Sequence, residues 1–241
     1  MKISRDLMGM PITIEVFGSP KKTIEKSYKR LEQINQLYSP YISTSQLSKF
    51  WSQSQNLSDM SKEFRSIYDE CIKYEKLTDG YFSAFFEKRY NPTGYVKGWA
   101  IEQVSKKIKK DGFDDYCINL SGDMKFSSSG EKIWRVAIQN PFDKNKSIAV
   151  LALKNGAIAT SGNYERGEHI LNPKKPNVIS DIAGVTIVGE DIIKADVLAT
   201  AIYAMGLSKA KKFLDKEQDY QALIIDKKEN IYQTSDYFVL V

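Results

Sequence analysis

The chain has 241 residues, of which 42% are hydrophobic and 12% are aromatic, so it carries enough apolar surface for a folded core and disorder is excluded. Its 35 Lys and Arg residues against 30 Asp and Glu residues give a net charge of +5, which permits an anionic ligand. The two cysteines and the single histidine exclude a disulfide framework and a histidine-rich metal site.

The first half of the chain predicts one strand followed by helices. Alternating apolar residues indicate a strand over residues 10–17, and helical spacing indicates an amphipathic helix over residues 21–38. A polar stretch follows over residues 43–58. Further helices are expected over residues 64–72 and around Ile101, Val104 and Ile108, the latter ending near Asp111-Gly112. The lysines at 106, 107, 109 and 110 fall on this last helix and predict a solvated face, because no nucleic-acid-binding motif accompanies them.

The second half predicts a sheet. Short β-branched runs lie at residues 116–120, 133–139, 147–153 and 182–188. Helices are expected over residues 195–206 and 209–215, and strands over 222–226 and 237–241 about the turn at 226–230. Regular βαβ alternation is absent, so we predict an α+β fold with a mostly antiparallel sheet. The sequence contains no repeat and no dividing linker, so residues 1–241 are expected to form one domain.

Asp196 and Thr200 form the most informative pair. One helical turn separates them, so both side chains point the same way. A carboxylate with a hydroxyl suits Mg²⁺, which completes its shell with water and phosphate oxygens. The alternative is an Asp near a helix start with a Thr bonded to the preceding turn.

Three further segments carry small or polar residues that suit a ligand. The stretch from Ala159 to Arg166 contains Ser161 and Gly162, and His169 follows it. Ser121-Gly122-Asp123 is expected to end a strand. Gly94, Lys97 and Gly98 stand near a helix start, where close backbone approach and a positive charge favour phosphate. Taken singly, each segment is better explained as an ordinary turn, and His169 as a hydrogen-bonded structural group.

The joint order of these motifs resembles the ApbE family, the FAD:protein FMN transferases. The resemblance covers nearly the whole chain. In chain order, the matching segments are Met8-Gly9-Met10-Pro11-Ile12, Tyr41 to Phe50, Thr78-Asp79-Gly80, Val96-Lys97-Gly98, Ser121-Gly122-Asp123, Ala159-Thr160-Ser161-Gly162, His169-Ile170 and Ala195-Asp196 to Ala199-Thr200.

The resemblance implies a T-fold-like sheet with packed helices and a helix-bearing N-terminal part, with FAD in the cleft between them and Mg²⁺ at the pyrophosphate. It implies metal ligation by the carbonyl of Gly94 and the side chains of Asp196 and Thr200. It implies flavin-nucleotide contacts from Met8, Tyr41, Tyr81, Phe82, Ser83, Asn91, Lys97, Ser161 and Leu171. Asp123 and His169 match family positions close to the cleft, and either is a candidate catalytic base.

Several positions depart from the family's pattern. Ser83-Ala84-Phe85 stands where the family has Asp-Pro-Thr, Asn91 and Asn172 replace aspartates, and Ala199 stands where some members have a carboxylate. The loss of these carboxylates is expected to affect the number of bound metal ions and the catalytic rate more than flavin binding.

The predicted function is Mg²⁺-dependent transfer of FMN from FAD to a Thr or Ser hydroxyl of an acceptor flavoprotein, with release of AMP. The alternatives are an FAD-binding protein without transferase activity and an FAD pyrophosphatase. Nucleic acid is not an expected partner. No apolar run approaches the roughly 18–20 residues of a transmembrane segment. The sequence shows no signal peptide or lipid-anchor motif, so we expect a cytoplasmic location, with membrane anchoring through a preceding segment as the alternative.

Overall fold

A computed structural model describes residues 1–85, 89–162 and 170–241 of the chain. It confirms the α+β prediction, and every pairing between its described strands is antiparallel. Among the described residues, no helix has both the length and the apolar character needed to cross a bilayer. The helices are α1 (Lys21–Tyr38), α2 (Gln46–Trp51), the 3-10 helix η1 (Leu57–Asp59), α3 (Lys62–Leu77), α4 (Thr93–Lys110), α5 (Ile192–Met205) and α6 (Leu207–Leu214).

The strands form two sheets. An eight-stranded sheet has the order β1-β2-β3-β4-β7-β8-β9-β10, and a three-stranded sheet has the order β11-β6-β5. The strands are β1 (Lys2–Leu7), β2 (Met10–Val16), β3 (Tyr116–Leu120), β4 (Asp123–Ser127), β5 (Trp134–Gln139), β6 (Ser147–Leu153), β7 (Gly156–Gly162), β8 (Ile182–Gly189), β9 (Gln221–Asp226), β10 (Ile231–Gln233) and β11 (Val239–Leu240).

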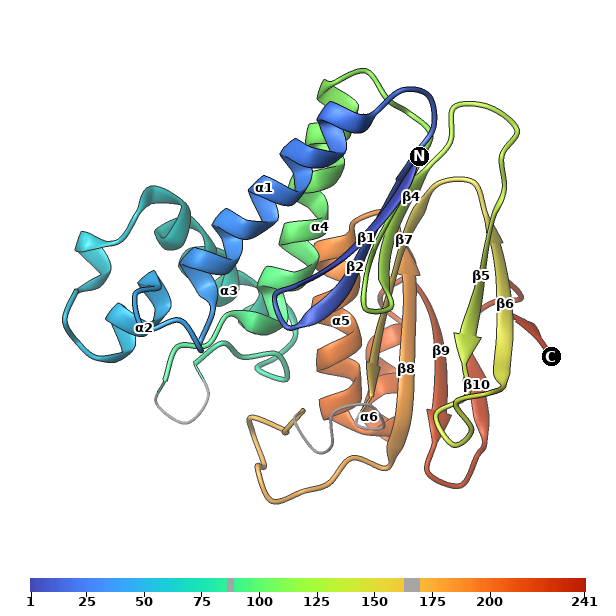
Figure 1. Ribbon diagram of the computed structural model, residues 1–241. Coiled ribbons are helices and arrows are strands. Elements are labelled where there is room, and N and C mark those ends of the chain that lie inside the picture. The colour runs from blue at the N-terminus through green and yellow to red at the C-terminus, as the bar shows by residue number, and fades with distance from the viewer. Residues whose placement is uncertain (86–88, 163–169) are drawn as a thin grey trace.

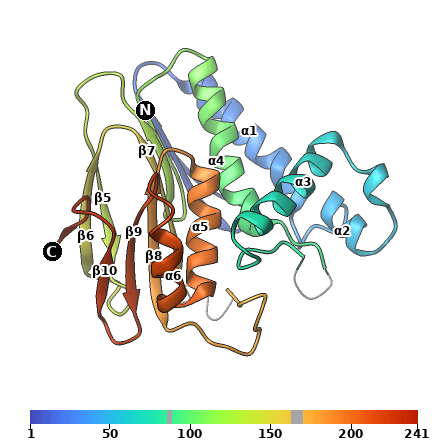
Figure 2. The same ribbon diagram turned by 180° about the vertical axis from the view of Figure 1, so that it is seen from behind.

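The large sheet lies between two layers. Helices α1, α4 and α5 cover one face, while β5 and β6 stand off the other face, as Figures 1 and 2 show. The main core fills the space between helices and sheet, and a smaller core around Phe126, Trp134 and Leu151 joins the two sheets. Strand alternation explains this division: Ile12 and Ile14 of β2 are fully buried on the helix side, whereas Thr13 between them faces the other way.

Helix α5 is the central helix, with most of its side chains buried against α4, β7 and β8. Its apolar residues run around the whole helix rather than along one face, as a buried helix requires. Asp191 caps its start by accepting hydrogen bonds from the backbone N–H groups of Ile193 and Lys194. Asp196 is therefore a buried carboxylate within a mostly apolar helix.

Two tight hairpins lie side by side at one end of the large sheet. Met8-Gly9 joins β1 to β2 and Ser121-Gly122 joins β3 to β4, and all four residues have positive φ. Positive φ at both loop positions is the signature of the two-residue turn that matches strand twist. The backbone N–H of Ser121 donates to the carbonyl of Pro11 at 3.2 Å, which ties the two turns together.

Several predicted elements are confirmed, the helix over residues 21–38 to the residue. Other expectations are wrong. The polar stretch 43–58 contains α2 and the start of η1, and β1, β4 and β10 were not predicted. The turn at 226–230 joins β9 to β10, whereas the end of the chain contributes only β11, which pairs with β6 in the other sheet.

Candidate functional site

A cavity of about 860 Å³ opens between the helices and the hairpin end of the large sheet. Its wall is built from the β1–β2 turn, the end of α1, the segment between α3 and α4, the start of α4, the β3–β4 turn, the end of β7 and α5. The structure brings together every predicted site residue that it describes: Met8, Tyr41, Tyr81, Phe82, Ser83, Asn91, Gly94, Lys97, Asp123, Ser161, Leu171, Asp196 and Thr200. His169 lies outside the described residues.

The contact between α4 and α5 positions Asp196. Its carboxylate accepts a 2.8 Å hydrogen bond from the backbone N–H of Gly98, an amide that in a regular α-helix donates to the carbonyl of residue 94. A Cβ on Gly98 would lie 2.9 Å from the carbonyl oxygen of Ile192 and 3.1 Å from Cβ of Asp196. Gly98 therefore serves the approach of the two helices, not the approach of a ligand as its position near a helix start suggested.

A buried ion pair lies beside Asp196. Lys97 Nζ is 2.9 Å from Oδ2 of Asp123, and the side chain of Asp123 is 2% exposed. The other oxygen of Asp123 accepts a 3.0 Å hydrogen bond from the backbone N–H of Thr160 on β7. Both oxygens are thus directed by fixed donors, one from α4 and one from the sheet. Asp123 begins β4, directly after the Ser121-Gly122 turn, rather than ending a strand.

The charges at the bottom of the cavity do not balance. Burial and then the negative charge of Asp123, whose carboxyl lies within hydrogen-bonding reach, hold the pKa of Asp196 well above its usual range. Lys97 and the Gly98 N–H act in the opposite direction. Two carboxyl groups therefore share one lysine, and the site requires either a bound proton or a further cation for neutrality.

Thr200 stands one turn beyond Asp196 on α5, as the spacing predicts, and both line the cavity. Its hydroxyl lies 3.4 Å from that of Ser161 on β7. Among the described residues, no three His, Cys, Asp or Glu side chains gather as a metal cluster. The oxygen groups that fit a hard cation are instead mixed: carboxyl groups, the Thr200 hydroxyl and the backbone carbonyl of Gly94.

Aromatic and apolar side chains form the rest of the wall. Phe82 is 3% exposed and stands next to Gly94, while Tyr41 at the rim is 94% exposed and free to cover a ligand. Tyr81 is flanked by two lysines: Lys209 Nζ donates to its hydroxyl, and Lys174 Nζ lies 4.9 Å from its ring centroid. The cavity thus combines planar apolar surface with positive charge, a combination that suits an aromatic anion.

Sequence reasoning missed Trp51 and Arg89, which also line the cavity. Trp51 donates its indole N–H to the carbonyl of Tyr90 at 2.5 Å, and the guanidinium of Arg89 lies 3.5 Å from the Trp51 ring centroid. The signal was present in the Ser45 cap followed by the apolar spacing Leu47, Phe50 and Trp51, which predicts a short helix.

Comparison with known proteins settles the family. The model of the ApbE family matches residues 8–89 and 87–224. The chain belongs to the ApbE family.

Its curated relatives share modest identity. An FAD:protein FMN transferase of Buchnera aphidicola subsp. Schizaphis graminum is 28% identical over 149 residues, covering 57% of this chain and 44% of that protein. The Escherichia coli K12 protein of the same name is 28% identical over 133 residues, covering 50% and 38%. The Haemophilus influenzae protein is 24% identical over 279 residues, covering 86% and 81%. The chain therefore spans less than half the length of the first two relatives in their matched regions.

Solved ApbE structures share the fold. Flavin transferase ApbE from Vibrio cholerae superposes with a TM-score of 0.82 at 21% identity, covering 98% of this chain and 97% of that one. The ApbE protein of Thermotoga maritima gives a TM-score of 0.85 at 19% identity, covering 98% and 97%. The predicted family and its fold are confirmed.

Proposed function

We propose that this ApbE-family protein transfers FMN from FAD to a Thr or Ser hydroxyl of an acceptor flavoprotein, releasing AMP. The observation that carries the proposal is the placement of Asp123, Asp196 and Lys97 together at the bottom of an aromatic-walled cavity. Residues 1–241 act as one domain in this proposal, since both halves of the chain line that cavity. The curated relatives that bear the name FAD:protein FMN transferase support the same activity.

The cavity has the size and the chemistry to hold FAD. Its volume of about 860 Å³ falls within the roughly 300–1,000 Å³ range of ligand pockets. We assign the ring systems to the aromatic and apolar wall, which includes Met8, Tyr41, Phe82 and Leu171. The pyrophosphate is assigned to Lys97, near the start of α4, where positive charge and the helix dipole favour phosphate.

The reaction exchanges one phosphorus–oxygen bond for another. The acceptor hydroxyl oxygen bonds to the FMN phosphorus, and the bond from that phosphorus to the bridging oxygen breaks. AMP leaves with the electron pair, and the hydroxyl proton passes to a base. Lys97 stabilises charge on the phosphate oxygens, and Asp123 holds the lysine in place through their 2.9 Å ion pair.

The oxygen groups around Asp196 fit a magnesium ion. The unbalanced pair of buried carboxyl groups favours a cation there, and the Thr200 hydroxyl and the Gly94 carbonyl complete the proposed protein ligands. Asp196 competes with the Gly94 carbonyl for the Gly98 amide, which supports the availability of that carbonyl. Bound Mg²⁺ would supply charge neutralisation at the pyrophosphate.

Two residues remain candidates for the base. Asp123 is in the cavity, but the Lys97 ammonium and the Thr160 N–H already occupy its two oxygens. Because both Asp123 oxygens already accept from these donors, we favour His169 as the base. The variant His169→Ala should lower transfer by roughly 10²–10⁴-fold with FAD affinity retained if it is the base. A loss of affinity equal to the loss of turnover would instead place it in the flavin pocket.

The deciding experiment incubates the protein with FAD and Mg²⁺, with and without a recombinant acceptor flavoprotein domain. Covalent FMN on the acceptor, found by mass spectrometry, is the expected result. Free FMN and AMP without acceptor labelling would support a pyrophosphatase, and unchanged bound FAD would support a flavin-binding protein. Absence of FAD binding at high micromolar concentration would overturn the transferase, the pyrophosphatase and the flavin-binding interpretations alike.

The metal proposal has its own test. Asp196→Asn should fold, need far more Mg²⁺ and lose most transfer, and Thr200→Ala should show a milder form because water replaces a neutral ligand. Asp191→Asn on the same helix removes a charge outside the cavity and serves as the matched control. A Mg²⁺ titration of Asp196→Asn that overlays the parent curve would show that the metal is placed wrongly.

A further inference from the structure

Strand β5 has an open edge. It pairs with β6 on one side, and among the described strands none pairs with its other side. The Ile148 carbonyl accepts a hydrogen bond from the Val241 N–H on the β11 side of β6. Backbone groups alternate in direction along a strand, so those of Ala149 and Leu151 point toward β5. These two residues oppose Ile138 and Val136. The backbone groups of Arg135 and Ala137 therefore face the open side.

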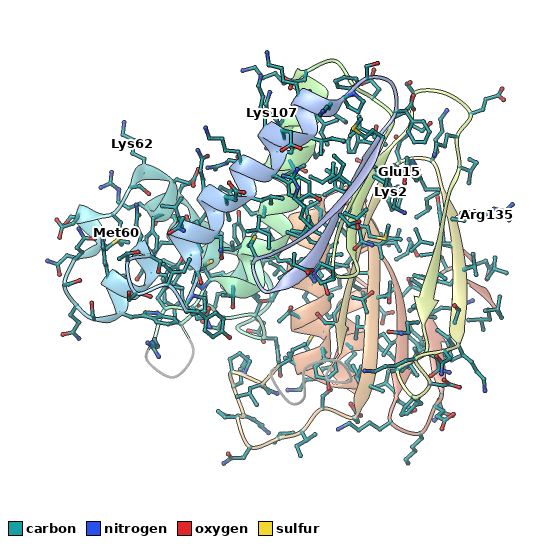
Figure 3. The ribbon with its side chains drawn as sticks, viewed as in Figure 1. Lys2, Glu15, Met60, Lys62, Lys107 and Arg135 are labelled. Carbon is teal, nitrogen blue, oxygen red and sulfur yellow. The ribbon has the colours of Figure 1, made fainter. Side chains whose placement is uncertain are left out.

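A groove runs along this edge. It has a volume of about 410 Å³, and residues 136–139 of β5 form one wall. The other wall is the face of the large sheet that the helices do not cover, where Thr13, Asn119 and Thr160 contribute side chains. Figure 3 shows Lys2 and Glu15 on that same face of β1 and β2, on the side toward β5. The small sheet leaves this part of the large sheet uncovered.

The groove and the candidate FAD cavity meet at the hairpin end of the large sheet. Ser121, Thr160 and Gly162 line both spaces. Asp123 marks the junction, because its carboxylate is on the cavity side and accepts from the backbone N–H of Thr160. An extended chain in the groove would thus end beside the residues assigned to phosphate transfer.

The lining selects the chemistry of the occupant. No charged side chain is among the described residues that line the groove, which are instead apolar or carry hydroxyl and amide groups. Such a lining gives no attraction to a nucleic acid or an anionic lipid. Open backbone donors and acceptors on a strand edge bind another backbone, and an added strand is an established way of binding an extended peptide.

We propose that the acceptor flavoprotein binds here by adding an extended, uncharged segment to the free edge of β5. The segment runs along the groove and carries its Thr or Ser hydroxyl past the Ser121-Gly122 turn to the FAD pyrophosphate. This inference rests on the proposed transferase function and names the surface that recognises its protein substrate.

The first test removes one backbone donor from the edge. Ala137→Pro deletes an N–H that faces the open side, so the β5–β6 ladder remains and the protein folds. Ala152→Pro is the matched control, because Ala152 is exposed on β6 and its backbone faces the β11 side. With the acceptor domain that the parent protein flavinylates, the KM for acceptor should rise about three- to tenfold for Ala137→Pro, the effect of one hydrogen bond. The KM for FAD should stay at the parent value.

The second test fills the groove. Thr13→Tyr places a larger side chain in the groove while retaining strand propensity, and should raise the KM for acceptor at least tenfold. Ala152→Tyr, at an exposed position of β6 outside the groove lining, is its control and should match the parent.

A third measurement needs no turnover. Hydrogen exchange with an acceptor whose target residue is changed to Ala should show protection of the Arg135 and Ala137 amides. If the parent protein fails to label any acceptor, the transferase function itself fails. Should it label the acceptor while β5 stays unprotected and both groove variants keep the parental KM, the docking surface is wrong and the function stands.

Discussion

Replacing Gly98 by alanine tests the contact that holds the site together. The added Cβ would lie 2.9 Å from the Ile192 carbonyl oxygen and 3.1 Å from both Asp196 Cβ and Ile193 Cα. Two of these three atoms belong to the backbone of α5, so no side-chain rotation relieves the overlap. The helices must separate by several tenths of an ångström, which lengthens the 2.8 Å hydrogen bond from Gly98 to Asp196.

The expected magnitude combines two opposing effects. Overpacking a tight core contact costs about 1–3 kcal/mol. Alanine in a helix interior recovers about 1 kcal/mol relative to glycine. The net loss of unfolding free energy is therefore about 0–2 kcal/mol, and a chain of this size shifts its Tm by about 2–4 °C per kcal/mol. The affinities for Mg²⁺ and for FAD should weaken more than this stability change suggests, because the displacement occurs at Asp196.

The assay is thermal denaturation beside an FAD titration at fixed Mg²⁺. Gly94→Ala is the stability control: it lies in the same helix, and its Cβ would stand at an ordinary 3.4 Å from a Phe82 ring carbon, so Tm should not fall. A Gly98→Ala protein with parental Tm and parental FAD affinity would refute the reasoning that this glycine sets the spacing of α4 and α5.

Three other expectations follow from the geometry. Asp191→Ala should lower the free energy of unfolding by about 1 kcal/mol because α5 loses its N-cap, whereas Asp191→Asn should cap the helix nearly as well. Urea unfolding of the two variants and the parent tests this, and equal stability of Asp191→Ala and the parent would contradict it. Burial raises the pKa of the Cys71 and Cys117 thiols to about 12, so the thiolate forms are disfavoured and both should resist a thiol reagent at pH 8 until the chain unfolds; fast labelling of the folded protein would contradict this. Trp51→Phe deletes the hydrogen bond to the Tyr90 carbonyl and should destabilise by about 1 kcal/mol, and parental urea stability would contradict it.

Local patterns predicted the elements that bury a regular face. The apolar residues of α1 recur at helical spacing, and its bounds were predicted to the residue. Strand β1 was not predicted because it is an edge strand. Arg5 and Asp6 are exposed, and charged residues at a sheet edge obscure the alternation of apolar and polar side chains. Strand β4 was not predicted because only the two-residue Ser121-Gly122 turn separates it from β3, so no loop marks where one strand ends and the next begins.

For the candidate site, too, local patterns predicted only the contacts between residues that are close in the sequence. The pairing of Asp196 with Thr200 is local, since one helical turn suffices to predict it. The ion pair between Lys97 and Asp123 joins a helix to a hairpin, and the Gly98–Asp196 bond spans 98 positions. No spacing rule reaches so far, and the resemblance to the ApbE family assembled these residues where periodicity could not. Helix α2 with Trp51 was missed for a different reason: its Ser45 cap and apolar spacing are a local signal, but they cover only six residues in a serine-rich stretch and were overlooked.

The hairpin end of the large sheet is where two proposed substrates must meet. The FAD cavity lies on the helix side of the sheet, and the acceptor groove lies on the side of β5. Strands β3, β4 and β7 are hydrogen bonded to their neighbours, so no hydroxyl passes through the sheet. The acceptor has to come around its end, over the Ser121-Gly122 turn. A two-residue turn is the shortest connection that β3 and β4 can have, and it brings the edge of the sheet to within one residue of Asp123. Lengthening that turn by inserted glycines should therefore raise the KM for a protein acceptor by a larger factor than the Kd for FAD, since Ser121 is only one part of the cavity wall and the aromatic side chains come from other elements. Equal changes in the two constants would contradict a route over the turn.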